Sequence, residues 1–152
     1  CVDQDMPVAV WTRDGPALME PVLQKYPTLQ FIVDHFAWAV PGDKREAKMQ
    51  AMINLARFKN VTVKVSSLPL VSGSHAPEYE DLHPMIKRVH AAYGAERLMW
   101  ASDQTQTMGK CRGTYAENAD IIRKYAAAYL PAADIQKMMH DTATRVFKWA
   151  VT

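Results

Sequence analysis

The sequence predicts an α/β protein in which four parallel strands alternate with helices. Four short apolar segments, rich in β-branched residues, are each followed by a longer stretch with helical periodicity. The apolar segments are nearly continuous, which is typical of parallel strands buried on both faces. The chain has 152 residues, of which 49% are hydrophobic and 22% are charged, as expected for one globular domain. We therefore treat residues 1–152 as a single domain unit.

The charge balance and the cysteine content exclude several classes of protein. Lys and Arg number 18 and Asp and Glu number 16, so no nucleic-acid partner is expected. No apolar run approaches the roughly 20 residues of a membrane helix, so no membrane partner is expected either. Two cysteines, Cys1 and Cys111, form no disulfide framework, which favours a reducing compartment, the cytoplasm. Because the first residue is not methionine, the chain is either processed or the C-terminal piece of something longer.

The four predicted strands each end in polar residues. The strands are expected at residues 6–11, 29–35, 61–66 and 97–103. The polar residues that follow or end them include Arg13, His35, Ser66 and Asp103. Folds of this class place their functional sites at the carboxyl ends of the strands, so we expect a site there.

Helical patterns follow each strand. They cover residues 16–26, 43–58, 78–93, 114–129 and 132–149, and Pro131 separates the last two. In the first helix, Leu18, Val22 and Tyr26 form the apolar stripe that we expect to face the core.

Helix-end signals support these boundaries. Asp43 is the expected N-cap of the second helix, and Gly94 is the expected left-handed C-cap of the third. Thr114 and Glu117 have the spacing of a capping box.

His35 and Asp103 are the strongest candidates for chemistry. His35 ends a buried strand and could be a base, a metal ligand, a hydrogen-bond donor to a ligand, or a structural histidine at the rim of the sheet. Asp103 also ends a buried strand and could be a general base, a metal ligand or a turn residue. Because right-handed crossovers bring all strand ends to one edge, the two side chains should meet there.

Weaker candidates surround this pair. Lys64 lies within the third strand and either lines a polar interior or pairs with Asp34 or Asp103. Arg13 follows the first strand and either binds a carboxylate through a bidentate pair of hydrogen bonds or is a solvated residue at the rim. The other histidines have no metal-ligand spacing and are interpreted as surface residues: His75, His83, His90 and His140.

Taken together, the segments resemble the C-terminal half of the amidohydrolase-related family of TIM barrels. Residues 6–11 (MPVAVW) resemble the fifth barrel strand and residues 26–35 (YPTLQFIVDH) the sixth. Residues 60–66 (NVTVKVS) are similar to the seventh strand, and residues 94–103 (GAERLMWASD) to the eighth. Residues 141–147 (DTATRVF) resemble the closing helix. The resemblance thus implies half of a TIM barrel, with four parallel strands and a C-terminal helix pair.

The resemblance also implies a function. The family hydrolyses or decarboxylates small organic acids, lactones or amides, with or without a divalent metal, most often zinc. Asp103 matches the eighth-strand aspartate, a metal ligand or proton carrier, and His35 matches the sixth-strand histidine, which polarises the substrate or shuttles protons. We assign four neighbouring residues to substrate binding: Trp11, Arg13, Lys64 and Ser66.

Departures from the family pattern leave a second reading open. Trp11 stands where the family usually has a metal-binding histidine, and an indole cannot ligate a metal. The first four strand–helix units, which carry a His-x-His pair in the family, are absent. The alternative is a non-catalytic remnant or an α/β interaction domain that keeps only the scaffold.

An open half-barrel should need a partner. One set of alternating strand residues is expected to point inward without an opposite wall, drawn from Val8, Val10, Phe31, Val33, Val63, Val65, Met99 and Ala101. We therefore expect the missing N-terminal half, or another copy of the chain in a homo-oligomer, beside a small-molecule substrate.

Overall fold

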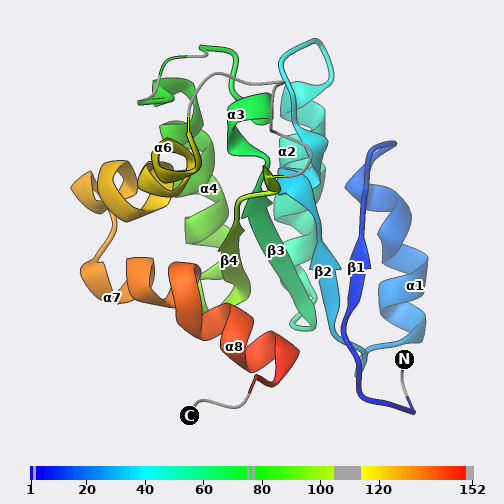
Figure 1. The fold of residues 1–152 in the computed structure, drawn as a ribbon. Coiled ribbons are helices and arrows are strands. Elements are labelled where there is room, and N and C mark those ends of the chain that lie inside the picture. Colours follow the sequence, from blue (N-terminus) through cyan, green and yellow to red (C-terminus); the bar gives the residue numbers. More distant parts are fainter. Residues whose placement is uncertain (2, 75, 77, 105–113, 150–152) are drawn as a thin grey trace.

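The protein is a four-stranded parallel sheet flanked by helices (Figure 1). The computed structural model describes residues 1, 3–74, 76, 78–104 and 114–149. The strands pair in chain order: β1 (Val8–Val10), β2 (Phe31–Val33), β3 (Val61–Ser66) and β4 (Leu98–Ala101). All four lie inside the predicted ranges, and all three pairings are parallel, as predicted. Cys111 and His75 lie outside the described residues.

Helices occupy every predicted helical stretch. The α-helices are α1 (Glu20–Lys25), α2 (Arg45–Asn54), α3 (Leu68–Val71), α4 (His83–Tyr93), α6 (Tyr115–Asp120), α7 (Ala132–Gln136) and α8 (Thr142–Phe147). Short 3₁₀ turns are η1 (Pro16–Met19), η2 (His35–Trp38), η3 (Leu55–Arg57), η4 (Glu80–Leu82), η5 (Ala95–Arg97) and η7 (Ala126–Ala128). Two π-helical turns, η6 (Ile121–Tyr125) and η8 (Lys137–Asp141), continue α6 and α7. Across the described part of the chain, no helix combines the length and apolarity that crossing a membrane requires.

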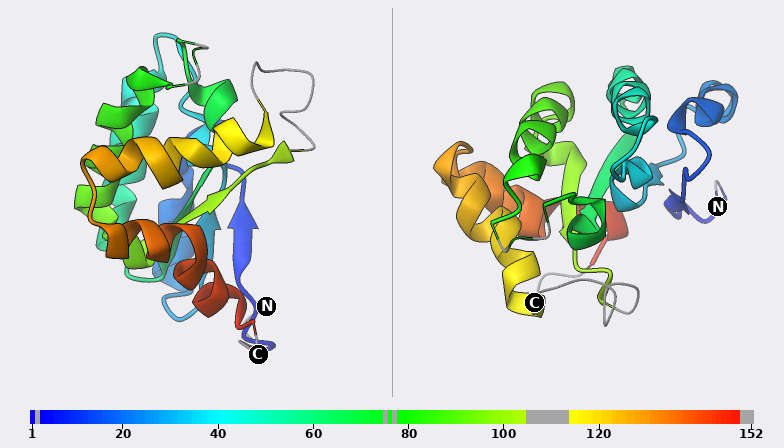
Figure 2. Two further views of the ribbon diagram at one scale, coloured as in Figure 1. Left: turned by 60° about the vertical axis from the view of Figure 1, so that its left-hand side comes forward. Right: turned by 90° about the horizontal axis from the view of Figure 1, so that it is seen from above.

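The main core lies between the sheet and the layer formed by α1, α2 and α4 (Figure 2). We call the face of the sheet under these helices the outer face, and the opposite one the inner face. The register pairs Val33 with Val63 and Val63 with Leu98, so these three side chains share the outer face. All three are fully buried in the main core.

The expected set of inward-facing residues was largely wrong. Phe31, Val33, Val63 and Val65 belong to the main core under the helices, and Val8 and Val10 pack against it. Of the expected set, Met99 faces the other way, in a small separate cluster with Ile32 and Val146. The register explains the error, because Leu98 rather than Met99 pairs with Val63 and therefore shares its face. Thr62 and Lys64 alternate with these core valines, so the inner face is partly polar.

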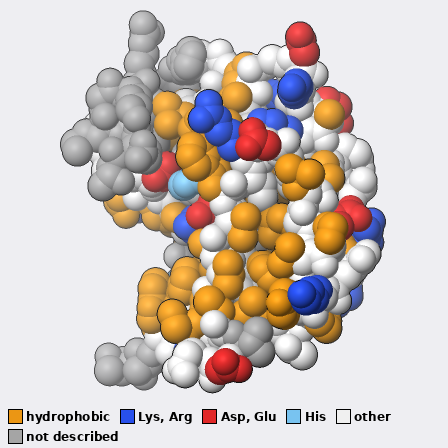
Figure 3. Space-filling view, turned by 90° about the vertical axis from the view of Figure 1, so that its right-hand side faces the viewer, with side chains coloured by type: hydrophobic (Ala, Val, Ile, Leu, Met, Phe, Trp, Pro, Cys, Tyr) orange, Lys and Arg blue, Asp and Glu red, His pale blue; other side chains and the backbone are white. Residues whose placement is uncertain are grey.

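The predicted apolar stripe of the first helix is also wrong. Leu18, Val22 and Tyr26 are 72%, 46% and 39% exposed, whereas Met19 and Leu23 are buried. The helix begins with the tighter η1 turn before α1, which shifts the phase of the 3.6-residue repeat. This helix is also the outermost one, and hydrophobic side chains gather over the face that it forms with β1 (Figure 3).

The helix-end predictions are mixed. Asp43 is not the N-cap, because α2 begins at Arg45 with Lys44 at the cap position. Gly94 ends α4 with the expected positive φ of 72°, but its ψ of 158° lies outside the left-handed helical region. The capping box is confirmed, since Thr114 accepts from the Glu117 N–H while the Glu117 carboxylate accepts from the Thr114 N–H.

Helix α8 crosses the amino-terminal end of the sheet on its inner face. The Thr142 hydroxyl donates to the Ala95 carbonyl at 3.0 Å, just before β4. At the other end, the Lys148 ammonium pairs with Asp5, just before β1. The helix therefore spans from one edge strand to the other and covers the end of the sheet opposite the predicted site.

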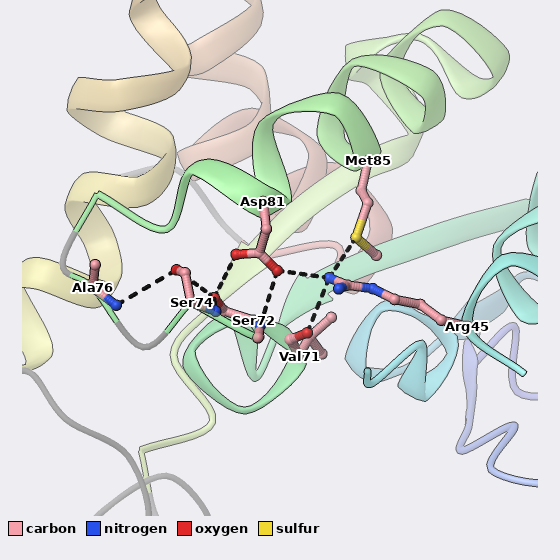
Figure 4. A network of polar contacts seen from close by, with 8 residues as sticks. Arg45, Val71, Ser72, Ser74, Ala76, Asp81 and Met85 are labelled. Atoms are coloured by element: carbon pink, nitrogen blue, oxygen red, sulfur yellow. Dashed lines mark hydrogen bonds and ion pairs between the residues drawn. The ribbon is translucent and has the colours of Figure 1, made fainter. Parts of the chain in front are cut away.

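A polar network fixes the segment after α3 against the start of α2 (Figure 4). The Asp81 carboxylate accepts from Arg45 at 3.0 Å, from the Ser72 hydroxyl at 2.6 Å and from the Gly73 N–H at 2.9 Å. Burial by itself raises the pKa of Asp81, but the hydrogen bonds from Gly73, Ser72 and Arg45 outweigh it and hold the pKa below the usual aspartate value.

Candidate functional site

The predicted site residues gather at the carboxyl ends of the strands. Trp11 follows β1, His35 begins the η2 turn after β2, and Asp103 follows β4. Ser66 is the last residue of β3 and is buried. The parallel sheet brings these positions to one edge, as predicted, because every strand runs in the same direction.

His35 is the centre of the polar cluster. Its Nδ1 atom lies 3.1 Å from the Ser66 hydroxyl and 3.0 Å from the Ser67 hydroxyl. The same atom lies 3.5 Å from the Asp103 carboxylate, to which Ser67 also donates a short hydrogen bond. The structure therefore brings His35 and Asp103 together through Ser67, although they lie far apart in the chain.

Lys64 pairs with Asp34, the first of the two partners that the sequence offered. Its ammonium lies 2.5 Å from the Asp34 carboxylate, and both side chains are mostly buried. The positive charge in the middle of the sheet is thus balanced within the described residues.

Three rings form an aromatic corner beside His35. Trp11 and Trp38 meet edge to face with centroids 5.6 Å apart, and each lies 6.3 Å from the His35 ring. Trp11 is 53% exposed, so it offers ring surface to a ligand. The Arg13 guanidinium carbon lies 5.8 Å from the Trp11 ring centroid, which places Arg13 at the rim of this corner rather than against His35.

The backbone of the site is left-handed at every polar position that contacts His35 except Ser66. Ser67 has a φ of 54° and Asp103 a φ of 50°. His35, Phe36, Ala37 and Trp38 form a continuous left-handed turn, with φ between 52° and 54°. Each such residue costs about 1–2 kcal/mol, and strain of this kind concentrates at functional sites.

Sequence reasoning missed Ser67 and Trp38. Ser67 directly follows the last residue of β3, and Trp38 lies three residues after His35 in the turn that follows β2. The signal that would have found both is their position at or just after a strand end, which they share with Ser66 and His35. The left-handed conformations carried no signal, because none of these positions holds glycine.

The described residues do not by themselves fit a zinc site. Catalytic zinc takes three protein ligands, but no group of three His, Cys, Asp or Glu side chains with suitable geometry occurs within residues 1, 3–74, 76, 78–104 and 114–149. The available donors are His35 and Asp103, and His35 Nδ1 is engaged with two serine hydroxyls. Trp11 adds no ligand.

Comparison with known proteins identifies a matching family and a similar curated protein. The family model of the amidohydrolases matches residues 1–149. An L-fucono-1,5-lactonase of Burkholderia ambifaria is 36% identical over 95 residues, which are 62% of this chain and 32% of the lactonase.

Solved structures show the same fold. An amidohydrolase from Burkholderia multivorans with bound zinc superposes with a TM-score of 0.77 at 20% identity, over 95% of this chain and 52% of that one. A protein from Pseudomonas putida, provisionally named a 2-pyrone-4,6-dicarboxylic acid hydrolase, gives a TM-score of 0.71 at 27% identity, over 96% of this chain and 52% of that one. The chain therefore spans about half the length of these structures. Since the family model covers nearly every residue, the chain belongs to the amidohydrolase family and has the fold of half of its TIM barrel.

Proposed function

We propose that the chain is the C-terminal half of a hydrolase that opens a small lactone or amide of an organic acid. The observation that carries the proposal is the His35–Ser67–Asp103 cluster at the carboxyl edge of the sheet. Residues 1–152 would then be one partial domain. The named activity of the lactonase relative makes a sugar-acid 1,5-lactone the first substrate to test.

The cluster suits activation of water. A carboxylate and a neutral imidazole can each accept a proton from a water molecule that attacks the carbonyl carbon of the substrate. The new C–O bond forms as the ring C–O bond of a lactone breaks, and the proton taken from water is returned to the leaving oxygen. The product is the open hydroxy acid. His35 and Asp103 are the proposed catalytic residues.

The neighbouring side chains suit a ring-shaped, acidic substrate. The exposed face of Trp11 offers a stacking surface, and Arg13 at the rim can hold a carboxylate through two parallel hydrogen bonds. Lys64 and Ser66 belong to the same proposed substrate-binding set, with Lys64 oriented by Asp34.

A partner must complete the site. This chain matches only about half of each of the two solved amidohydrolase-like structures. We therefore propose that the other half of the barrel, or else another copy of the chain, closes the sheet. A divalent metal, with zinc as the leading candidate, would need ligands from the other half of the barrel or the other copy in addition to Asp103. The proposed location is the cytoplasm, on the cysteine content alone.

The test is hydrolysis of sugar-acid 1,5-lactones and small amides by the chain joined to the rest of its barrel. Asp103→Asn and His35→Gln should each lower kcat/KM by about 10²–10⁴-fold, the usual contribution of acid–base groups. His140→Gln, on an exposed histidine of η8, is the matched control and should be fully active. Full activity of the Asp103 and His35 variants would refute the proposed roles.

One observation favours the alternative of a non-catalytic scaffold. The described residues hold two metal-ligating side chains at the site, and Trp11 fills a position where the resemblance leads one to expect a histidine. A folded, complete barrel without hydrolytic activity towards lactones or amides would support this alternative.

A further inference from the structure

The hydroxyl of Ser67 does not cap the helix that follows it, although capping is the usual role of a serine at this position. Ser67 precedes α3 at the N-cap position, yet its side chain makes no capping hydrogen bond. The residue is fully buried and has a φ of 54°, a conformation that glycine would adopt without strain. The hydroxyl instead lies between His35 Nδ1 and Asp103, in contact with both.

The direction of these hydrogen bonds follows from proton counting. An ionised carboxylate only accepts, so the single hydroxyl proton of Ser67 goes to Asp103. The Ser67 oxygen can then only accept from His35, and Nδ1 must carry the proton. Ser66 agrees, because its hydroxyl is directed at the Lys64 carbonyl at 3.5 Å and leaves its oxygen as an acceptor towards Nδ1.

We propose that Ser67 is a positioning residue that fixes His35 in the tautomer protonated on Nδ1. Asp103 orients the Ser67 hydroxyl, Ser67 orients the Nδ1 proton, and Nε2 keeps its lone pair. Within the described residues Nε2 has no hydrogen-bond partner, so it is the ring atom available to take a proton from water. The inference rests on the proposed function for the use of Nε2, but the tautomer itself does not depend on any activity.

The chain of contacts from Asp103 through Ser67 to His35 also accounts for the left-handed backbone at these three residues. Three of its members, His35, Ser67 and Asp103, have φ between 50° and 54°, and their side chains converge on one point from three different strand ends. An unstrained glycine at position 67 would lose the link between the other two. The hydroxyl therefore gives a reason for a strained serine at this position.

The experiment is nitrogen-15 NMR of the histidine side chains in the chain joined to the rest of its barrel, near neutral pH. Long-range couplings distinguish a protonated ring nitrogen from one with a lone pair. In the parent protein, the Nδ1–H form of His35 should exceed the Nε2–H form by about tenfold or more, which is what one hydrogen bond linked to a charged group supports.

Ser67→Gly is the decisive variant, because glycine suits the backbone at φ 54° while the change removes the hydroxyl together with Cβ. It should reduce the tautomer ratio of His35 severalfold. Ser66→Ala is the matched control: it removes the other hydroxyl at Nδ1, which has no hydrogen bond to Asp103, and should leave the Nδ1–H form dominant. Ser67→Ala tests whether backbone relief matters and should behave like Ser67→Gly.

Two results would overturn the inference: a parent protein with His35 protonated mainly on Nε2, or a Ser67→Gly variant with the parental ratio. Neither result bears on hydrolysis, which the lactone assay measures separately. Conversely, an inactive protein with the expected tautomer would refute the proposed function and leave the role of Ser67 intact.

Discussion

Asp34 and Lys64 show how a single pair can shape the inner face of the sheet. Their charged groups lie 2.5 Å apart, and their side chains are 15% and 22% exposed. At this depth, leaving one partner without the other costs more than the loss of a surface pair. The pair therefore has a structural role that is distinct from any contact with substrate.

Lys64→Met should lower the free energy of unfolding by about 1–3 kcal/mol, between the ranges for exposed and buried pairs. Asp34→Leu combined with Lys64→Met should recover part of this loss, because no uncompensated charge is left in the sheet. Urea unfolding measures both. Arg88→Ala, which breaks an exposed pair with Glu46, is the control and should cost less than about 1 kcal/mol. A larger loss in the double variant than in Lys64→Met would contradict this account.

Metal binding is a second prediction at the scale of residues. His35 and Asp103 could together offer two ligands, and no group of three occurs among the described residues, whereas catalytic zinc takes three from the protein. This chain should therefore bind zinc weakly or not at all. Isothermal titration calorimetry of the 152-residue chain tests this directly. Tight one-to-one binding that is abolished by Asp103→Ala would show that the described residues do not contain the full ligand set.

At the scale of elements, the segment after α3 depends on one carboxylate. Asp81 accepts three hydrogen bonds from Ser72, Gly73 and Arg45, and they hold its pKa below the usual value. Folding thus stabilises the ionised form of the Asp81 carboxyl group relative to its protonated form. This contribution is fully present above the unfolded pKa of about 4, and it is lost as the pH falls through the lower folded pKa.

Asp81→Asn should therefore lower the free energy of unfolding by about 2 kcal/mol at pH 7, the range for hydrogen bonds to a charged group. The difference between variant and parent should shrink as the pH falls below about 4. Urea unfolding at pH 7 and at the lowest pH where both proteins fold would show this. A difference that stays constant over this range would mean that the ionised carboxylate is not what stabilises the segment.

The elements also show how far sequence reasoning reaches. The strands and their parallel order follow from continuous apolar runs, and the Thr114 capping box follows from a three-residue spacing. The meeting of His35 and Asp103 follows from topology alone. The phase of the first helix did not follow, because the η1 turn interrupts its repeat.

Two further features could not be predicted, for related reasons. The orientation of the strands was misjudged, because a strand apolar on both faces gives no alternation from which to choose the inner one. The contacts that Ser67 makes with His35 and Asp103 depend on its left-handed backbone, and a serine in a sequence does not indicate that conformation.

At the scale of the whole molecule, both edges of the sheet are open. β1 pairs with β2 alone and β4 with β3 alone among the described strands. Beside β1, a groove of about 240 Å³ runs along α1, lined in part by Trp11, Leu18 and Val22. The Thr12 hydroxyl also lines it, is buried, and has no hydrogen-bond partner within the described residues. This edge has the character of a surface that a further strand and helix would cover.

The isolated chain should therefore associate or aggregate rather than remain a 17.1 kDa monomer. Light scattering coupled to size-exclusion chromatography measures the mass in solution. Leu18→Lys with Val22→Lys should reduce association, because both exposed side chains lie in the groove beside β1. Arg88→Ala, which breaks an exposed ion pair on α4 away from both edge strands, is the control. A stable, active monomer would contradict both the open-edge argument and the need for a partner.

The left-handed turn at His35–Trp38 has a consequence for the protein's evolution. Four successive residues there, together with Ser67 and Asp103, adopt a conformation that β-branched side chains resist most strongly. Substitutions at these positions should thus be selected first for compatibility with the positive φ, before any effect on the chemistry of the side chain. At Ala37, glycine should survive selection for folding, whereas valine, isoleucine and threonine should be purged. Phe36 is constrained further, because its side chain is fully buried in the main core. The proposed substrate-binding residues Trp11 and Arg13 have no positive φ, so substitution there does not meet this backbone constraint.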